Sequence, residues 1–292
     1  MKARLECFPC YFRQALQASE IAGASDEEKW EAARAVAALL TKVSPDDESM
    51  LVAEEIHKAI KEALGNPDPY YNVKEEYTGI AEGLLPRIEE MARAGADPLL
   101  SAAKLAIAGN IIDFGAGTNF NVEAAVRGAL EAPFAIDHLE RLREALASAR
   151  SVLYLGDNTG EIYFDRPMLR LIKFGGSEIT FVTRGAPILN DATIEYARRA
   201  RIDEFASLAD TGAMSPGFPP GRVRPEVFSL FETADVVVSK GQANFETLCH
   251  IKRPGLFFLL KIKCEIVARM IGGGKLGDVL LMEAGRFPLL EV

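Results

Sequence analysis

The sequence lacks the features of disulfide-stabilised secreted proteins and of membrane proteins. It has four cysteines among 292 residues, too few for a disulfide framework. No apolar run approaches the roughly 20 residues that a membrane-spanning helix needs, and the longest runs, such as 255–260, have the length of a strand. The first residues also lack the apolar segment of a signal peptide. We therefore expect a cytoplasmic protein with no membrane partner.

Positive charge and histidine are scarce as well. The chain has 33 Lys and Arg against 42 Asp and Glu, a net charge of −9. Such a chain repels phosphate backbones, and no Lys/Arg cluster with interleaved aromatic residues offsets this, so no nucleic-acid partner is expected. The chain has three histidines, His57, His138 and His250, and no Ser or Cys motif pairs with any of them. A serine-hydrolase or cysteine-protease mechanism is therefore not expected.

The composition is that of a globular protein, with 49% hydrophobic and 26% charged residues. At roughly 150 residues per domain, the length suits one large domain or two modest ones. The pattern changes near residue 149. We predict a mainly α-helical region over residues 1–148 and an α/β domain over residues 149–292.

Capping residues locate the helices of the first region. Ser25 as N-cap and Glu28 as its capping-box partner predict a helix that runs to residue 40. A second helix is expected to start at Ser44 and Pro45 and to end at Gly65. Two further helices are expected over 74–94 and 97–109.

The second region alternates short apolar strands with helices. The expected strands are 151–156, 178–183, 235–239 and 256–262, and the helices that follow them are 160–174, 189–201, 243–250 and 264–271. This alternation predicts a parallel sheet that is covered on both faces. In such folds ligands bind at the carboxyl ends of the strands, so the candidate functional residues are sought there.

Oxygen-bearing side chains follow the first two strands. Asp157 and Asn158 come directly after the first, and Glu161 lies one helical turn further. Asn190 and Asp191 form a second Asn-Asp pair in the segment after the second strand, at the same sheet edge, and Asp191 is a candidate third oxygen ligand. Carboxylate and carboxamide oxygens suit a hard cation such as Mg²⁺ or Mn²⁺, whereas Asp and Asn at these places also serve as ordinary helix caps.

A lysine ends the third strand. Lys240 followed by Gly241 and a helix N-terminus predicts an anion site, in which a positive charge is joined by free backbone N–H groups. The alternative is a solvated surface lysine, which the three preceding valines disfavour. Two acidic clusters and this lysine at one sheet edge together favour a metal-and-phosphate site over three separate caps.

These motifs resemble those of the damage-control phosphatase family, also called domain of unknown function eighty-nine. The resemblance is carried by GDNTGE at 156–161, RGAPILND at 184–191, KGQANFE at 240–246, AGNIIDFG at 108–115 and the amino-terminal CFPCYFRQA, which is similar to the prokaryotic branch. It implies a helical amino-terminal region over an α/β/α three-layer sandwich with a mostly parallel sheet. The implied activity is metal-dependent hydrolysis of small phosphomonoesters, such as sugar phosphates or damaged metabolites.

The resemblance also implies residue roles. Asp157, Asn158 and Asp191 would hold the metal, with Co²⁺ or Ni²⁺ as alternatives to Mg²⁺ or Mn²⁺. In the expected mechanism a metal-activated water attacks the phosphoryl group. Either Glu161 or Asp113 is the carboxylate that assists this attack. The catalytic candidates are Glu161, Asp113 and Lys240, and the substrate-binding candidates are Asn110, Lys240, Asn244 and Arg184.

Two other classes of function stay open. A protein that binds metal or a phosphorylated metabolite as a sensor would carry the same site without turnover. A methyltransferase is more distant, because no Gly-x-Gly-x-x-Gly follows the first strand. The oligomeric state is not predicted.

Cys7 and Cys10 have the spacing of a zinc or redox motif. One such pair supplies only two of the four ligands of a structural zinc, and Cys264, Cys249 or His57 are candidates to complete it. The alternative is that these are structural thiols in the core.

Overall fold

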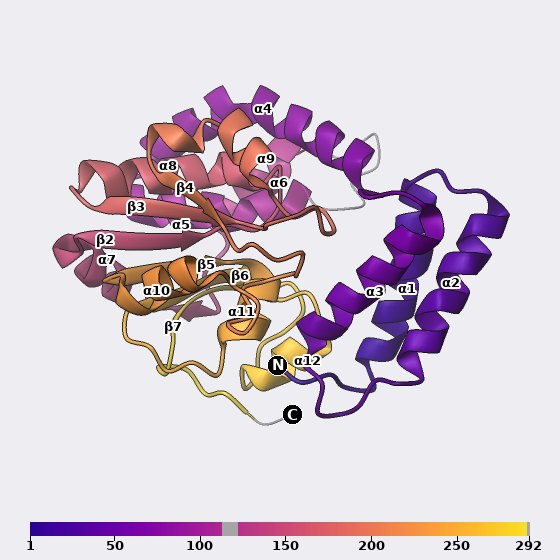
Figure 1. The fold of residues 1–292 in the computed structure, drawn as a ribbon. Coiled ribbons are helices and arrows are strands. Elements are labelled where there is room, and N and C mark those ends of the chain that lie inside the picture. The colour runs from indigo at the N-terminus through magenta and orange to yellow at the C-terminus, as the bar shows by residue number, and fades with distance from the viewer. Residues whose placement is uncertain (113–121, 291–292) are drawn as a thin grey trace.

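The structure, a computed structural model, describes residues 1–112 and 122–290 (Figure 1). The helices before the main strands are α1 (Cys7–Ile21), α2 (Asp26–Leu40), α3 (Ser49–Leu64), α4 (Tyr71–Ala94), α5 (Pro98–Ala108), the 3₁₀ turn η1 (Gly109–Ile112), α6 (Val122–Glu131) and α7 (Leu139–Ser148). Those that follow are α8 (Ile162–Phe174), α9 (Ile194–Arg199), η2 (Ile202–Glu204), α10 (Pro225–Thr233), α11 (Gly241–Leu248) and α12 (Glu265–Met270). No helix of the described residues is both long and apolar enough to cross a membrane.

A seven-stranded sheet lies at the centre of the described residues. Its strands are β1 (Ile136–Asp137), β2 (Ser151–Leu155), β3 (Glu178–Thr183), β4 (Ser207–Asp210), β5 (Val236–Lys240), β6 (Leu256–Lys261) and β7 (Val279–Glu283), in the order β1-β7-β6-β5-β2-β3-β4. Every neighbouring pair is parallel except β6 and β7, which are antiparallel. The four predicted strands are confirmed. The short strands β1 and β4 and the antiparallel β7 were not predicted.

Side-chain alternation along the strands builds two cores. In β2, Val152 and Tyr154 face the core beneath α4, α5, α7, α8 and α9, whereas Leu153 and Leu155 face the core beneath α10, α11 and α12. The α/β/α sandwich implied by the resemblance is therefore confirmed (Figure 1). Both cores draw on residues before and after 149, and the predicted division into two domains at that residue stays a prediction.

Helices α1, α2 and α3 form a small bundle beside the sandwich (Figure 1). The expected capping box starts α2: the Glu28 N–H donates to Ser25 Oγ, and the Ser25 N–H donates to the Glu28 carboxylate. The left-handed Gly65 ends α3 as expected. The bundle meets the sandwich where the carboxyl ends of β2, β3, β5 and β6 emerge, since residues from both parts line a common pocket.

The predicted start of α3 at Ser44 is wrong, because α3 begins at Ser49. Ser44 instead closes a turn, in which its N–H donates to Asp47 Oδ2 at 2.8 Å and its Oγ accepts from the Asp46 N–H at 3.1 Å. Glu48 is held extended by the amino-terminal segment, since it forms an antiparallel bridge with Lys2 and the following Ser49 N–H donates to the Met1 carbonyl at 3.0 Å. Pairing between distant segments thus overrides the local helix-start signal.

Helix α9 is shorter than the predicted 189–201. Its expected first turn is used to join two strand ends. The Ala192 N–H donates to the Asp157 carbonyl at 2.8 Å, and the Ala192 carbonyl accepts from the Arg184 N–H at 3.0 Å. The helix therefore starts only at residue 194, beyond these contacts.

His57 on α3 is buried, and its Nε2–H donates to Gln14 Oε1 at 2.9 Å. Burial, with a smaller contribution from the positive charge of Lys61, lowers the pKa of His57 to about 3. The unfolded chain takes up this proton near the ordinary pKa of 6.5, so acidification below that value favours unfolding. His57 therefore stabilises the fold above pH 6.5, and this contribution is lost as the pH falls toward 3.

We expect His57→Gln to flatten the pH dependence of stability. Between pH 6 and pH 4 the free energy of unfolding of the wild type should fall more steeply than that of the variant, by up to about 1.4 kcal/mol per pH unit. Urea denaturation at several pH values measures both slopes, with pH 8 as the reference condition. Equal slopes would contradict the assignment of a neutral buried imidazole.

Candidate active site

The loops after β2 and β3 bring three predicted metal ligands together. Asn158 and Asp191 form an isolated antiparallel bridge, and the Thr159 N–H donates to the Asn190 carbonyl at 2.9 Å. Asp157 precedes this bridge and is tied to the second loop through its own backbone carbonyl. Asp157, Asn158 and Asp191 are all largely buried. Main-chain pairing between the loops thus sets the positions of the three side chains.

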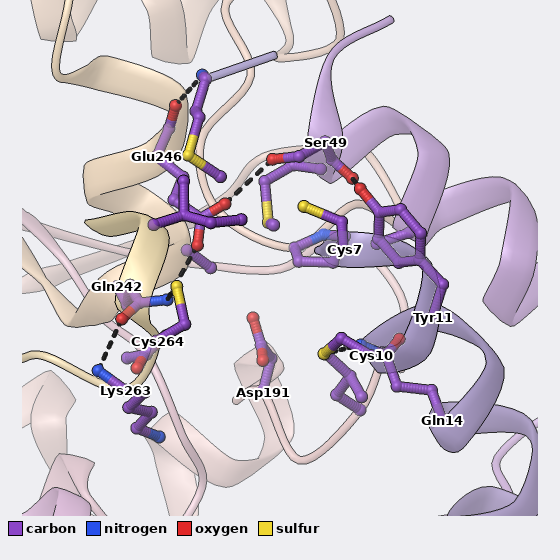
Figure 2. A pocket seen from close by; sticks show the side chains of 18 of the residues that line it. Cys7, Cys10, Tyr11, Gln14, Ser49, Asp191, Gln242, Glu246, Lys263 and Cys264 are labelled. Carbon is purple, nitrogen blue, oxygen red and sulfur yellow. Dashed lines mark hydrogen bonds between the residues drawn. The ribbon is translucent and has the colours of Figure 1, made fainter. Parts of the chain in front are cut away.

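These three residues line a cavity of about 310 Å³ between the sandwich and the helical bundle (Figure 2). One wall comes from α1 and α3, with Cys7, Cys10, Tyr11, Gln14 and Ser49. The opposite wall comes from the segments after β5 and β6, with Gln242, Glu246, Lys263 and Cys264. Asp191 lies between the two walls in the same view. The site is therefore closed by parts of the chain that lie far apart in sequence.

Glycine allows the closest approach in this site. Gly241, at φ +77°, follows β5, and a Cβ atom on it would lie 1.9 Å from Asp157 Oδ2. Strands β2 and β5 are neighbours at the point where the chain leaves in opposite directions, toward β3 on one side and β6 on the other. This is the topological switch point, the usual ligand position in an open α/β sheet.

Arg184 bridges the carboxylates of Asp157 and Asp191. Its Nε donates to Asp191 Oδ2 at 2.5 Å, one terminal nitrogen contacts Asp157 Oδ1 at 3.4 Å, and the other donates to Asn244 Oδ1 at 3.3 Å. The guanidinium is buried and is not among the residues that line the cavity. Arg184, predicted to bind substrate, thus holds Asp157 and Asp191 in place.

Lys240 is the centre of a second buried network. Its ammonium group donates to Glu161 Oε1 at 2.7 Å, to Asp165 Oδ1 at 2.7 Å and to the Ala106 carbonyl at 2.6 Å. These three contacts use all three of its N–H donors. Lys240 is fully buried and does not line the cavity. Its surroundings differ from the open anion site that the strand-end pattern predicts.

Glu161 connects this network to the metal candidates. Its Oε2 accepts from Asn110 Nδ2 at 2.6 Å and from Asn158 Nδ2 at 3.1 Å, while its Oε1 is held by Lys240. Both carboxylate oxygens are therefore engaged, and Glu161 faces the amides rather than the cavity. Asp113, the other candidate base, lies outside the described residues.

Asn110 and Asn244 lie in the same buried layer. Asn110 Nδ2 also contacts Asp157 Oδ2 at 3.5 Å, and Asn110 Oδ1 has no hydrogen-bond partner among the described residues. Asn244 Nδ2 donates to the carbonyls of Lys240 and Gly156, at 2.7 and 3.1 Å, and so ties the ends of β5 and β2 together. Neither residue lines the cavity.

The buried cluster carries more negative than positive charge. In the described residues, four carboxylates, from Asp157, Glu161, Asp165 and Asp191, meet two cations, Lys240 and Arg184. Burial raises the pKa of Asp157 well above its ordinary value, Glu161 and Asp191 raise it further, and Arg184 and Lys263 oppose the shift.

The four carboxylates exceed the two cations of the cluster by two negative charges, which is the charge that one divalent cation would balance. No three His, Cys, Asp or Glu side chains form a metal-binding group among the residues that the structure describes. The predicted ligand set has only two such residues, Asp157 and Asp191, and its third donor is the Asn158 amide. Oxygen donors of this kind fit Mg²⁺ or Mn²⁺.

Lys263 lines the cavity and was not predicted, although it follows a predicted strand as the other candidates do. It lies two residues after β6, at the same sheet edge as the other candidates, and its side chain is exposed. Gln242 positions it by accepting from its backbone N–H at 2.8 Å. Lys263 is thus a cation of the cavity wall, close enough to Asp157 to lower the pKa of that carboxyl.

The cysteines divide between core and cavity. Cys7, Cys10 and Cys264 line the cavity, all four cysteines are free thiols, and Cys249 is buried in the core. Cys264 Sγ accepts from Gln242 Nε2 at 3.5 Å, and His57 bonds to Gln14. The alternative of core thiols fits Cys7 in part, but Cys10 is exposed.

The sequence and the fold of the chain are similar to those of proteins of one family. Residues 3–279 match the damage-control phosphatase ARMT1-like domain. The chain is 34% identical to a damage-control phosphatase of Pyrococcus horikoshii over 92% of this chain and 94% of that protein. It is 38% identical to one of Archaeoglobus fulgidus over 76% and 78% of the two chains.

A solved structure is similar over almost its whole length. The crystal structure of a DUF89 family protein from Pyrococcus horikoshii superposes with a TM-score of 0.90, at 32% sequence identity, over 97% of this chain and 99% of that chain. The match includes the helical bundle as well as the sandwich, since so little of either chain is left out.

We expect Gly241→Ala to displace Asp157 and to weaken Mn²⁺ binding by about 10- to 100-fold, as changes around metal ligands commonly do. Gly176→Ala is the matched control, because Gly176 has φ +96° and no atom within 4 Å of an added Cβ. Both variants pay the cost of a left-handed alanine, about 1–2 kcal/mol. Calorimetric titration with Mn²⁺ separates them, and equal affinities would contradict the role of Gly241.

Proposed function

Because the chain belongs to the damage-control phosphatase family, we propose that it is a metal-dependent hydrolase of small phosphorylated metabolites whose active site is the cavity over Asp157, Asn158 and Asp191. The family relation itself supports a phosphatase that acts on phosphorylated metabolites. The proposal adds the metal, the site and the residue roles. The observation that carries it is the convergence of three oxygen-bearing side chains from two strand ends on the floor of one cavity.

Asp157, Asn158 and Asp191 would hold the cation. A divalent metal in this position supplies a Lewis acid for a phosphoryl oxygen and lowers the pKa of a water molecule. The chain's own contribution is to keep the three donors in place before substrate arrives. Arg184 does this for the two carboxylates, and Glu161 does it for the Asn158 amide.

Lys240 acts from below the site as a positioning residue. A buried carboxylate without a partner is costly, and the ammonium group keeps Glu161 and Asp165 paired in the fully buried layer. Glu161, fixed in this way, presents Oε2 to the Asn158 and Asn110 amides. In this arrangement Lys240 supports the ligand geometry and does not touch the phosphoryl group.

Lys263 is the residue that we assign to the phosphoryl group. It is a positive side chain on the cavity wall, on the same side as Gln242. A charge-assisted hydrogen bond to a phosphate oxygen contributes about 1.5–3 kcal/mol. The remaining wall, from α1 and α3, would contact the organic part of the substrate, and a cavity of about 310 Å³ suits a small metabolite such as a sugar phosphate.

Phosphate release from an aryl phosphate tests the metal and the site together. Chelator-stripped protein should be inactive, and Mg²⁺, Mn²⁺, Co²⁺ or Ni²⁺ added singly should restore turnover. Asp157→Ala should abolish both turnover and metal binding, because it removes one of two carboxylate ligands. Asp203→Ala, at an exposed position in η2, is the control and should behave as wild type. Tight metal binding without turnover on aryl or sugar phosphates would favour the sensor alternative.

Lys263→Ala should weaken substrate binding more than the chemical step. The loss of a charged hydrogen bond predicts a KM increase of about 10- to 100-fold, with kcat changed much less. Lys252→Ala is the control, because Lys252 is exposed and does not line the cavity. Steady-state kinetics on both variants decides the assignment. An unchanged KM would remove Lys263 from the phosphate site.

A further inference from the structure

Two thiols stand one helical turn apart on the wall of the cavity. Cys7 is the first residue of α1, and Cys10 follows three residues later. Both line the cavity, Cys7 buried and Cys10 exposed (Figure 2). Helix geometry places the Cα atoms of residues i and i+3 about 5 Å apart, within the range of about 4.4–6.8 Å that a disulfide spans. The Cα spacing of the pair therefore permits a disulfide.

Cys10 is exposed to reagents in the cavity, and one side chain donates a hydrogen bond to its sulfur. Gln14 Nε2 lies 3.7 Å from Cys10 Sγ and donates to it. The other end of the same amide accepts from the buried His57 imidazole at 2.9 Å, so the amide is held with its N–H groups toward the thiol.

Cys7 is placed to act second. It is shielded in the wall beside Tyr11, whose hydroxyl donates to the Ser49 carbonyl at 3.0 Å. Burial raises the pKa of the Cys7 thiol. An incoming reagent in the cavity therefore meets Cys10 first, and Cys7 is the neighbouring thiol within reach of a modified Cys10.

We propose that Cys10 is a covalent modification site for low-molecular-weight disulfides, and that Cys7 is its resolving thiol. In the first step the Cys10 thiolate attacks a disulfide RSSR, which forms a Cys10–S–SR bond and releases one thiolate RS⁻. In the second step the Cys7 thiolate attacks Cys10 Sγ, which forms the Cys7–Cys10 disulfide and releases the second RS⁻. Two protein thiols are oxidised and one RSSR is reduced to two thiols.

The two products have different consequences for the cavity. An adduct on Cys10 occupies space in front of Asp157, Asn158 and Asp191, whereas the internal disulfide removes the adduct. The first product should therefore block substrate access, and the second should restore it. This consequence rests on the proposed function, but the covalent chemistry does not.

The experiment treats the full chain with excess oxidised glutathione, blocks the remaining thiols with iodoacetamide and maps each cysteine by peptide mass spectrometry. In wild type we expect a Cys7–Cys10 disulfide. Cys7→Ser should retain a glutathionyl group on Cys10, and Cys10→Ser should show neither product on α1. Cys249→Ser, at a core position that does not line the cavity, is the control and should match wild type.

Modification of Cys264 in place of Cys10, a Cys10–Cys264 disulfide, or unmodified wild type after prolonged treatment would each overturn the proposal. Phosphate release is measured on the same samples. Glutathionylated Cys7→Ser should lose at least about 90% of its turnover, a tenfold effect equal to about 1.4 kcal/mol, and should recover it on reduction. Full turnover with a complete adduct would overturn the blocking effect. If untreated protein shows no turnover, the proposed function fails, and the thiol mapping still decides the modification site.

Discussion

The need to balance buried negative charge constrains this site more than any other interaction. Four carboxylates lie together, two at the floor of the cavity and two beneath it, and Lys240 and Arg184 are the cations that separate them. Each cation bridges two carboxylates, so removal of either one would leave uncompensated buried charge. The layout divides the site into a deep layer, which Lys240 neutralises, and an upper layer around Asp157 and Asp191, where excess negative charge meets the cavity. The proposed divalent ion would bind in the upper layer.

The parallel sheet is what makes this division possible. The carboxyl ends of β2, β3, β5 and β6 emerge at one edge, so side chains from four separate segments meet there without long connections. Main-chain bonds between the loops after β2 and β3 then fix Asp157, Asn158 and Asp191 relative to one another. The absence of a side chain at Gly241 lets β5 approach Asp157 closely.

Much of the sandwich could be predicted, because strands that are apolar on both faces and a helix after each have few other interpretations. The meeting of Asp157 with Asp191 follows from the same rule. The environment of Lys240 could not be predicted, since its carboxylate partners come from the N-cap and the first turn of α8, and its carbonyl partner comes from α5. The same rule applies to Lys263, which follows the fourth predicted strand. The start of α3 failed because pairing with the amino-terminal segment decides it.

The two walls of the cavity have independent origins in the chain. The metal candidates and their supporting network belong to the sandwich, whereas Tyr11, Gln14 and Ser49 belong to a bundle built from the first 64 residues. Substitutions on the inner side of that bundle can therefore reshape the space offered to a substrate while the hydrolytic chemistry stays intact. Because of this separation, substrate selectivity can change through substitutions in one segment without a compensating change in the other.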